Sequence, residues 1–390
     1  MIDSTFFKKN AIFIYTIIGL IQLFYLTVLC VPNYAHIVLF FSLFAIGFVI
    51  LEKVGAVIFT SQINSFQSKI FICIFIAVFT SIIVSSRLPI INNTIKFGLS
   101  NTRGYFLSDA YSYFSIINAM FFPLGMLLIF YKNCIEKYVM IASVIVVCLA
   151  DIIFIGARNS SFFMFVYYFI FLVDIRYFNK TKIVIIFACV LSIILLFEAS
   201  TRIRSGFVGD PSEYWLPKIF YSNISDSSYL NVNAIIWLSE LTWMLLPIIY
   251  LIMYISHSIA DFYVFLINYN SYLVPTFAHL LDQLALYTGQ DRSINQDIIS
   301  VMRVRSGYYQ TAYASIIIDY GFIIFIFPLI YIILKKSNMY YAVNVLLLVF
   351  TSLSLIENYF YQGLKPLHFF YFLVYYWIFV RKNIMAMTRR

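Results

Sequence analysis

The chain has 390 residues, of which 63% are hydrophobic and 11% charged, and its mean hydropathy is +0.91. This composition excludes a soluble globular domain and indicates a protein embedded in a membrane. The formal net charge of +9 does not point to nucleic acid, because the basic residues are dispersed between apolar segments and form no continuous polar face.

The apolar segments predict an all-α polytopic membrane protein with about ten transmembrane helices. Runs of about 18 or more nearly uncharged residues can cross a hydrocarbon core of ~30 Å as helices, and no strand-like alternation is seen. We expect the first helix to be retained, since no A-x-A cleavage site closes it. The helices are expected at residues 11–31, 35–51, 70–86, 113–131, 138–156, 160–173, 183–199, 313–334, 340–356 and 366–380.

Residues 200–312 form the long segment that is not plainly membrane-spanning, between seven helices in residues 1–199 and three in residues 313–390. We expect a large periplasmic loop with interfacial or re-entrant helices. Two stretches in it, 233–255 and 262–281, are apolar enough to make twelve crossings the alternative. Ten is preferred because polar residues and a proline interrupt those stretches, namely Glu240, Pro247, His257, Asp261 and Asn268. The shorter outer loop, 87–112, is expected to be an irregular cap.

The basic residues predict the orientation. Lys8 and Lys9 place the amino end inside, and an even number of crossings returns the carboxyl end to the cytoplasm. Under this topology the inner loops hold 11 Lys and 4 Arg, and the outer loops 3 Lys and 8 Arg. Because Arg offers a planar fork that grips phosphate oxygens, its enrichment outside indicates an anionic ligand. The alternative is that these arginines snorkel or pair with loop carboxylates.

Five arginines are the candidate ligands of a pyrophosphate. Arg158 lies in the short turn GARNS, residues 156–160, between two long apolar helices, where a charge is costly. Arg202 and Arg204 follow the seventh expected helix, and Arg303 and Arg305 precede the eighth, so the two pairs bracket the long loop. Together they would surround a diphosphate at the outer leaflet, where low dielectric strengthens each contact. The alternative for Arg158 is an interfacial role facing lipid headgroups.

His257 and His279 are the candidates for proton transfer in the long loop, whereas His36 and His368 are read as interfacial. Asp319, two turns into the eighth helix, is either a buried acid or a polar link to a neighbouring helix. Other carboxylates considered are Asp261, Asp282, Asp291, Asp297 and Glu357. Aromatic residues of the loop would stack on sugar rings or anchor the interface: Tyr214, Trp215, Trp237, Trp243, Tyr308 and Tyr309.

No Gly-rich phosphate loop, HExxH, paired Cys cluster or outer D-x-D motif occurs, so neither a metal site nor a cofactor is expected. The GARNS turn, YISHSIADF at 254–262 and YQTAYASIIIDYG at 309–321 resemble the O-antigen and oligosaccharide repeat-unit polymerases, the Wzy family. The resemblance covers most of the chain in topology.

This resemblance implies a metal-independent, integral-membrane glycosyltransferase of the bacterial inner membrane. It would transfer a growing glycan from undecaprenyl diphosphate to the non-reducing end of an incoming undecaprenyl-diphosphate-linked repeat unit. Implied partners are membrane lipid, a Wzz-type chain-length regulator and a Wzx-type flippase, and no nucleic acid. We expect catalytic roles for Arg158, His257, Arg303 and Arg305. Substrate contacts are expected from Arg202, Arg204, His279, Tyr309 and Asp319, and the identity of the base, His257 or a nearby acid, stays open.

Three other functions are weighed. A flippase for the same lipid-linked glycan predicts charged residues in a central cavity and pseudo-symmetric halves, whereas the polar residues here gather on one predicted face. An acyltransferase would need an activated His or Ser early in the chain, and none stands out. A purely structural subunit leaves the outer arginine enrichment unexplained.

Overall fold

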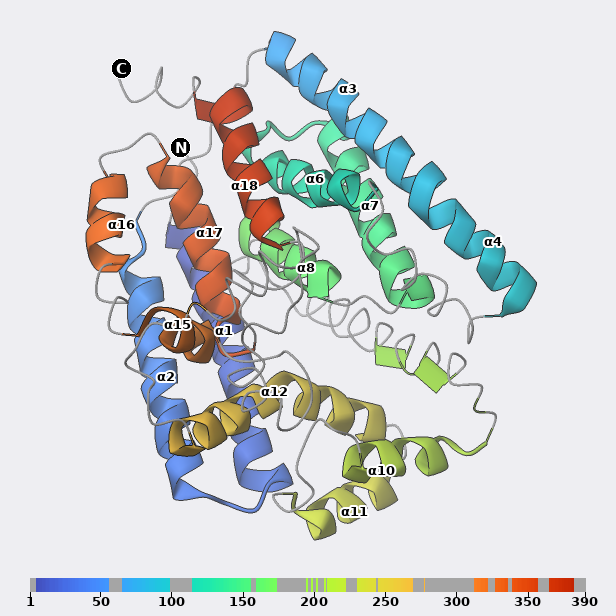
Figure 1. Cartoon of the computed structure of the whole chain (residues 1–390), viewed down its shortest axis with the longest axis vertical. Helices are drawn as coiled ribbons and strands as arrows, with labels where there is room; N and C mark the ends of the chain where they lie inside the picture. The colour runs from blue at the N-terminus through green and yellow to red at the C-terminus, as the bar shows by residue number, and fades with distance from the viewer. Residues whose placement is uncertain are drawn as a thin grey trace.

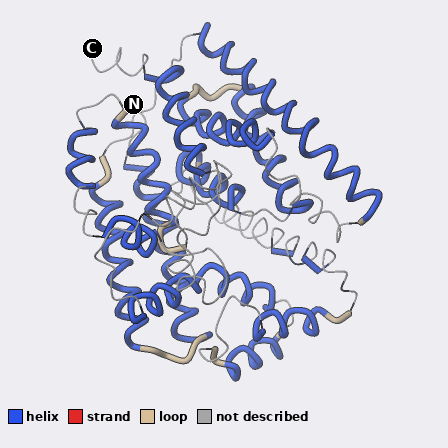
Figure 2. The backbone as a smooth tube through the Cα atoms, in the orientation of Figure 1, coloured by secondary structure: helices blue, strands red, loops and turns tan. Residues whose placement is uncertain are grey.

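The computed structural model of the chain describes residues 5–55, 65–98, 114–155, 159–173, 194–195, 198, 201–202, 207, 209–221, 230–242, 245–268, 277, 312–321, 327–335, 339–356 and 365–381. All regular elements in these ranges are helices (Figure 2). Those in the first half are α1 (Thr5–Phe24), α2 (Tyr34–Lys53), α3 (Ser65–Ile82), α4 (Leu88–Phe97), α6 (Phe114–Leu127), α7 (Ile135–Ala150) and α8 (Asn159–Leu172) (Figure 1). The others are α10 (Pro211–Tyr221), α11 (Val232–Leu241), α12 (Leu245–Asn268), α15 (Ala312–Tyr320), α16 (Phe327–Lys335), α17 (Tyr340–Leu353) and α18 (Lys365–Tyr375).

The expected all-α class is confirmed for the described residues. Four helical segments are long and apolar enough to cross a membrane: Phe6–Leu29, Tyr34–Lys53, Phe66–Phe97 and Ile135–Phe154. This agrees with a membrane-embedded protein, while the total of ten or twelve crossings stays a prediction. The expected helix at 183–199 lies almost wholly outside the described residues.

The expected irregular cap at 87–112 is wrong for its first part. The structure continues α3 through a π-helical turn, η2 (Ile83–Arg87), directly into α4. The prediction placed Pro89 in an irregular cap, but Pro89 lies in the first turn of α4, where a missing N–H costs nothing. α4 then ends at Gly98, whose φ of 79° suits glycine.

Two further predictions about where helices end are partly wrong. The single helix expected at 313–334 is two helices, α15 and α16, and Gly321, with φ 48°, ends α15 in a left-handed conformation that favours glycine. In the long segment, Glu240 and Pro247 do mark helix ends, near the end of α11 and the start of α12. His257 and Asp261 do not interrupt α12, which runs through both.

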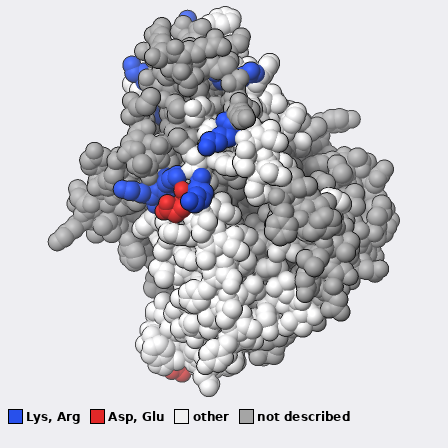
Figure 3. Space-filling model, turned by 90° about the vertical axis from the view of Figure 1, so that its left-hand side faces the viewer, with Lys and Arg blue, Asp and Glu red and all other residues white. Residues whose placement is uncertain are grey.

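One end of the helical array collects lysines, and we call it the lysine end. Lys8 Nζ donates to Glu52 O at 2.9 Å, which brings the start of α1 to the end of α2. Tyr331 OH accepts from Gly55 N at 3.1 Å, so the end of α16, with Lys335, lies there too. On the face seen in Figure 3, basic and acidic side chains form one group near mid-height, and the surface below this group is uncharged down to an acidic group at the lower edge.

The long segment builds the opposite end of the array. The π-helical turn that ends α1, η1 (Tyr25–Leu29), meets the start of α11: Asn231 N donates to Leu29 O at 2.8 Å. The Asn231 side chain accepts from Ala234 N at 3.2 Å and caps α11. α12 then runs across α1 and α2 and contacts both, and α10 packs on α12 (Figure 1). We call these three helices the α10–α12 layer.

Asn10 ties the start of α1 to the end of α8. Its buried Nδ2 donates to Ile170 O at 2.8 Å and to Val173 O at 2.6 Å, one in the last turn of α8 and one in the residue that follows it. We expect Asn10→Ala to lower the free energy of unfolding by about 1–3 kcal/mol, because these buried acceptors lose their donor.

Thermal unfolding in detergent measures this change. The control is Ser42→Ala, which removes an exposed hydroxyl bonded only within α2, to Val38 O. Equal stability of the two variants would contradict the role given to Asn10.

Candidate functional site

The structure describes three of the predicted site residues: Arg202, His257 and Asp319. The other six lie outside the described residues: Arg158, Arg204, Arg303, Arg305, His279 and Tyr309. The predictions for those six therefore stay predictions. Of the three described residues, Arg202 and His257 are joined through the α10–α12 layer, whereas Asp319 lies in α15.

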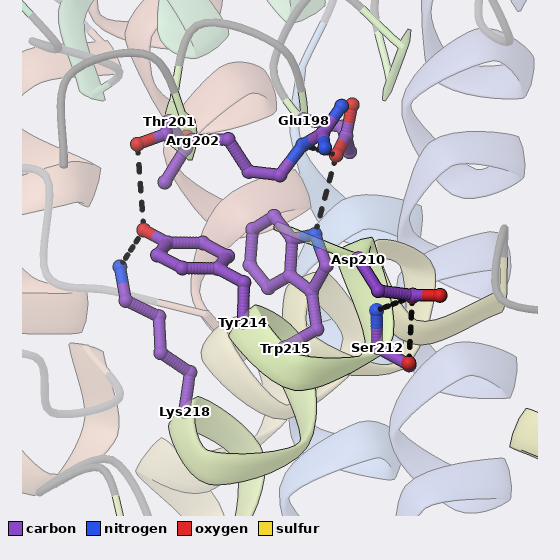
Figure 4. Close-up of polar contacts among 8 residues, drawn as sticks. All are labelled: Glu198, Thr201, Arg202, Asp210, Ser212, Tyr214, Trp215 and Lys218. Atoms are coloured by element: carbon purple, nitrogen blue, oxygen red, sulfur yellow. Dashed lines mark hydrogen bonds and ion pairs between the residues drawn. The ribbon is translucent and has the colours of Figure 1, made fainter. Parts of the chain in front are cut away.

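Arg202 forms an ion pair with Glu198, four residues earlier (Figure 4). The Glu198 side chain is 5% exposed and that of Arg202 is 26% exposed, so the pair lies at the edge of the interior. Glu198 Oε1 also accepts from Trp215 Nε1 at 3.5 Å, and Trp215 is fully buried in α10. Arg202 thus has the carboxylate partner that the sequence left as an alternative to an anionic ligand.

The same cluster fixes α10. Tyr214 OH bonds to Thr201 O at 3.3 Å, and Lys218 Nζ donates to Tyr214 OH while lying 4.4 Å from the centre of that ring (Figure 4). Asp210 caps the helix by accepting from the Ser212 hydroxyl and amide, both at 2.7 Å, and these bonds lower the pKa of the Asp210 carboxyl. Glu198, Thr201, Arg202, Tyr214, Trp215 and Lys218 are called the Trp215 cluster below.

Two aromatic contacts of α12 lie between the Trp215 cluster and His257 in the sequence of that helix. The Trp215 ring lies 5.3 Å from Tyr250 of α12, and the Tyr254 ring lies 6.1 Å from His257. Residues 250 and 257 are seven apart, which places them on one face of α12 about 10 Å from each other along the axis. α12 therefore carries Tyr250 and Tyr254 between the Trp215 cluster and His257, and tyrosine rings and an imidazole are groups suited to contacting a sugar and moving a proton.

His257 is held in a buried polar neighbourhood. It is 2% exposed, and the serines on both sides of it, Ser256 and Ser258, are fully buried. Ser258 Oγ donates to Leu355 O at 3.0 Å, and Gln22 Nε2 donates to the same carbonyl at 2.9 Å. An imidazole fixed in this way can act as a general base once a hydroxyl comes within hydrogen-bond reach.

Asp319 is buried near the end of α15, and its backbone carbonyl accepts from Phe277 N at 3.0 Å. α15 starts on the end of α17, because Ala312 N donates to Ser354 O at 2.9 Å. Tyr313 OH bonds to Ser354 Oγ at 2.9 Å. The start of α15 is therefore held on the end of α17, and Asp319 lies seven residues further along α15.

Three polar residues that the sequence did not single out have structural roles. The role of Glu198 could have been predicted, because an acid four residues before an Arg on a helix indicates an ion pair. Asp151 carried no such signal: it pairs with Arg87, whose Nη2 lies 2.8 Å from Asp151 Oδ1. Gln22 lies among apolar residues of α1, and the hydropathy pattern gave no indication of its role. Arg87 and Arg202, the two arginines of the predicted outer set that the structure describes, therefore both have carboxylate partners.

Within the described ranges, no three His, Cys, Asp or Glu side chains gather as a metal site would require. Comparison with protein-family models, curated proteins and solved structures gave no match.

We expect Arg202→Met to destabilise the protein by about 1–3 kcal/mol, since it leaves the buried Glu198 carboxylate without its cation. The double variant Arg202→Met/Glu198→Gln should recover part of this loss, because the amide carries no charge and still accepts from Trp215. Thermal unfolding of wild type, both single variants and the double variant measures the coupling. Additive losses would contradict the assigned pair.

Proposed function

We propose that this chain polymerises lipid-linked oligosaccharide repeat units at the outer face of the inner membrane. It transfers the growing glycan from undecaprenyl diphosphate to the non-reducing end of an incoming undecaprenyl-diphosphate-linked repeat unit. The supporting observation is that the long segment builds a layer opposite the lysine end, and that this layer connects the Trp215 cluster to the buried His257. The resemblance of the three short motifs to the repeat-unit polymerases points to the same reaction.

In this proposal the reaction is a direct displacement at the anomeric carbon. The acceptor hydroxyl oxygen forms the new bond to that carbon, while the bond from the carbon to the phosphate oxygen breaks. Undecaprenyl diphosphate leaves with the electron pair, and His257 accepts the hydroxyl proton. Arg158, Arg303 and Arg305 offset the charge that develops on the leaving diphosphate.

Each residue type is suited to its assigned role. A buried imidazole beside a tyrosine ring is a base that bulk water does not compete with. The partly buried Tyr250 and Tyr254 rings are suited to the apolar face of a sugar, whereas the fully buried Trp215 has a packing role in α10. The guanidinium fork matches phosphate oxygens. Arg202, paired with Glu198, contributes mainly by holding α10 in this proposal.

Gene deletion followed by analysis of the surface glycan tests the proposal. A polymerase deletion leaves lipid capped with a single repeat unit, whereas a flippase deletion, the alternative function, removes exported repeats altogether. Unchanged chain length would exclude both functions. Complementation with Arg158→Ala or Arg305→Ala should fail to restore long chains, and full restoration by both variants would refute the arginine assignment.

A further inference from the structure

Gln22 is a buried polar residue in the otherwise apolar second half of α1. It is fully buried, and its Nε2 donates to Leu355 O at 2.9 Å and to Ile255 O at 3.3 Å. One side-chain amide therefore joins α1 to α12 and to the turn after α17. An apolar residue would pack here without the cost of burying an amide, so the donated bonds are the reason for a glutamine.

These bonds lie on both sides of His257. Ile255 O, two residues before it, accepts from Gln22, and Ser258 Oγ, the next residue, donates to Leu355 O at 3.0 Å. The two donors converge on the single carbonyl of Leu355. α12 is thus fixed against α1 and against the turn after α17, on either side of the histidine.

The acceptor half of Gln22 takes no part in this arrangement. Gln22 Oε1 is buried and has no hydrogen-bond partner among the described residues. Removing the amide altogether therefore removes only the donated bonds to residues 255 and 355. This makes Gln22→Met, similar in length and apolar, a specific probe of those bonds.

We propose that Gln22 and Ser258 are positioning residues that fix His257 for proton transfer. This inference rests on the proposed function. A base must lie within about 2.6–3.2 Å of the proton donor, so a small displacement of α12 is enough to disable it. In this proposal Gln22 does not contact the substrate, and it affects catalysis only by fixing the position of His257.

The test uses the full-length protein in lipid nanodiscs with an undecaprenyl-diphosphate-linked repeat unit as substrate. Gln22→Met should lower kcat on the order of 100-fold with KM little changed, the effect expected of a base displaced by about 1 Å. Ser258→Ala should lower kcat less, and Ser258→Thr, which keeps the hydroxyl, should restore it. In a His257→Gln background, Gln22→Met should cause no further loss.

Ser352→Ala is the matched control. Its hydroxyl also joins α17 to α1, by donating to Ala11 O at 3.3 Å, but neither this bond nor its bond to Leu348 O at 2.6 Å involves α12. Its kcat should equal that of wild type. The inference is overturned if folded Gln22→Met and Ser258→Ala keep wild-type kcat, or if Gln22→Met lowers kcat equally with and without His257. A wild-type protein that forms no glycosidic bond would instead refute the proposed function itself.

Discussion

His257→Gln is expected to slow glycan elongation by about 10²–10⁴-fold, the usual contribution of a positioned general base. The imidazole is buried, and hydrogen bonds at Ile255 and Ser258 fix α12 on both sides of it. Residue 257 lies on the face of α12 where Tyr250 contacts Trp215. Glutamine fills similar space and keeps a polar end, but it cannot take the proton from the hydroxyl of the acceptor sugar. Initial rates with a lipid-linked repeat unit measure the loss, and KM should change little because the substrate contacts remain.

His36→Gln is the control for this prediction. His36 is also buried, and its ring lies edge-on 4.4 Å from Tyr263 of the same helix α12. It should keep the wild-type rate, because the proposal gives it no proton to move. A His257→Gln enzyme as fast as wild type, or a His36→Gln enzyme as slow as His257→Gln, would contradict the assignment of His257 as the base.

Arg87→Met is expected to destabilise the protein by about 3–5 kcal/mol. Arg87 and Asp151 are 8% and 5% exposed, and Arg87 Nη2 lies 2.8 Å from Asp151 Oδ1. The pair joins η2 to the π-helical turn that ends α7, η4 (Asp151–Ile155). Without Arg87, the Asp151 carboxylate would stay buried with no other hydrogen-bond or ion-pair partner among the described residues.

The double variant Arg87→Met/Asp151→Val should regain most of that stability, since an apolar pair of similar volume carries no uncompensated charge. Lys137→Met is the matched control at the other end of α7. Lys137 is also buried, but it donates to the neutral Tyr131 O and Asn133 Oδ1, so its loss should cost less. Thermal unfolding in one detergent compares all three, and a double variant as unstable as Arg87→Met would contradict the account.

Helix positions followed largely from hydropathy. α2 and α17 start within one residue of expectation, because an unbroken apolar run has one stable form in a membrane. Prediction failed where one residue decides the backbone. Pro89 is compatible with the first turn of a helix as well as with a loop, so its presence did not decide between them. Nothing in the sequence indicated that Gly321 would take a φ of 48° and end a helix.

The site was predictable in part, for a comparable reason. His257 stood out as a polar residue in an apolar run, and Glu198 could have been found from its spacing to Arg202. Contacts between Gln22 and Leu355, or between Arg87 and Asp151, join residues 333 and 64 positions apart, and a single sequence carries no signal for them. Sequence therefore indicated the groups that carry chemistry better than the buried groups that hold them.

The most direct test of the central claim is to give the purified protein, alone in lipid nanodiscs, a single undecaprenyl-diphosphate-linked repeat unit. The account predicts products with two or more repeats and the release of one undecaprenyl diphosphate for each new glycosidic bond. Both should be nearly abolished by His257→Gln. Substrate that stays a single repeat, under conditions where the protein remains folded, would contradict the claim that this chain forms the bond.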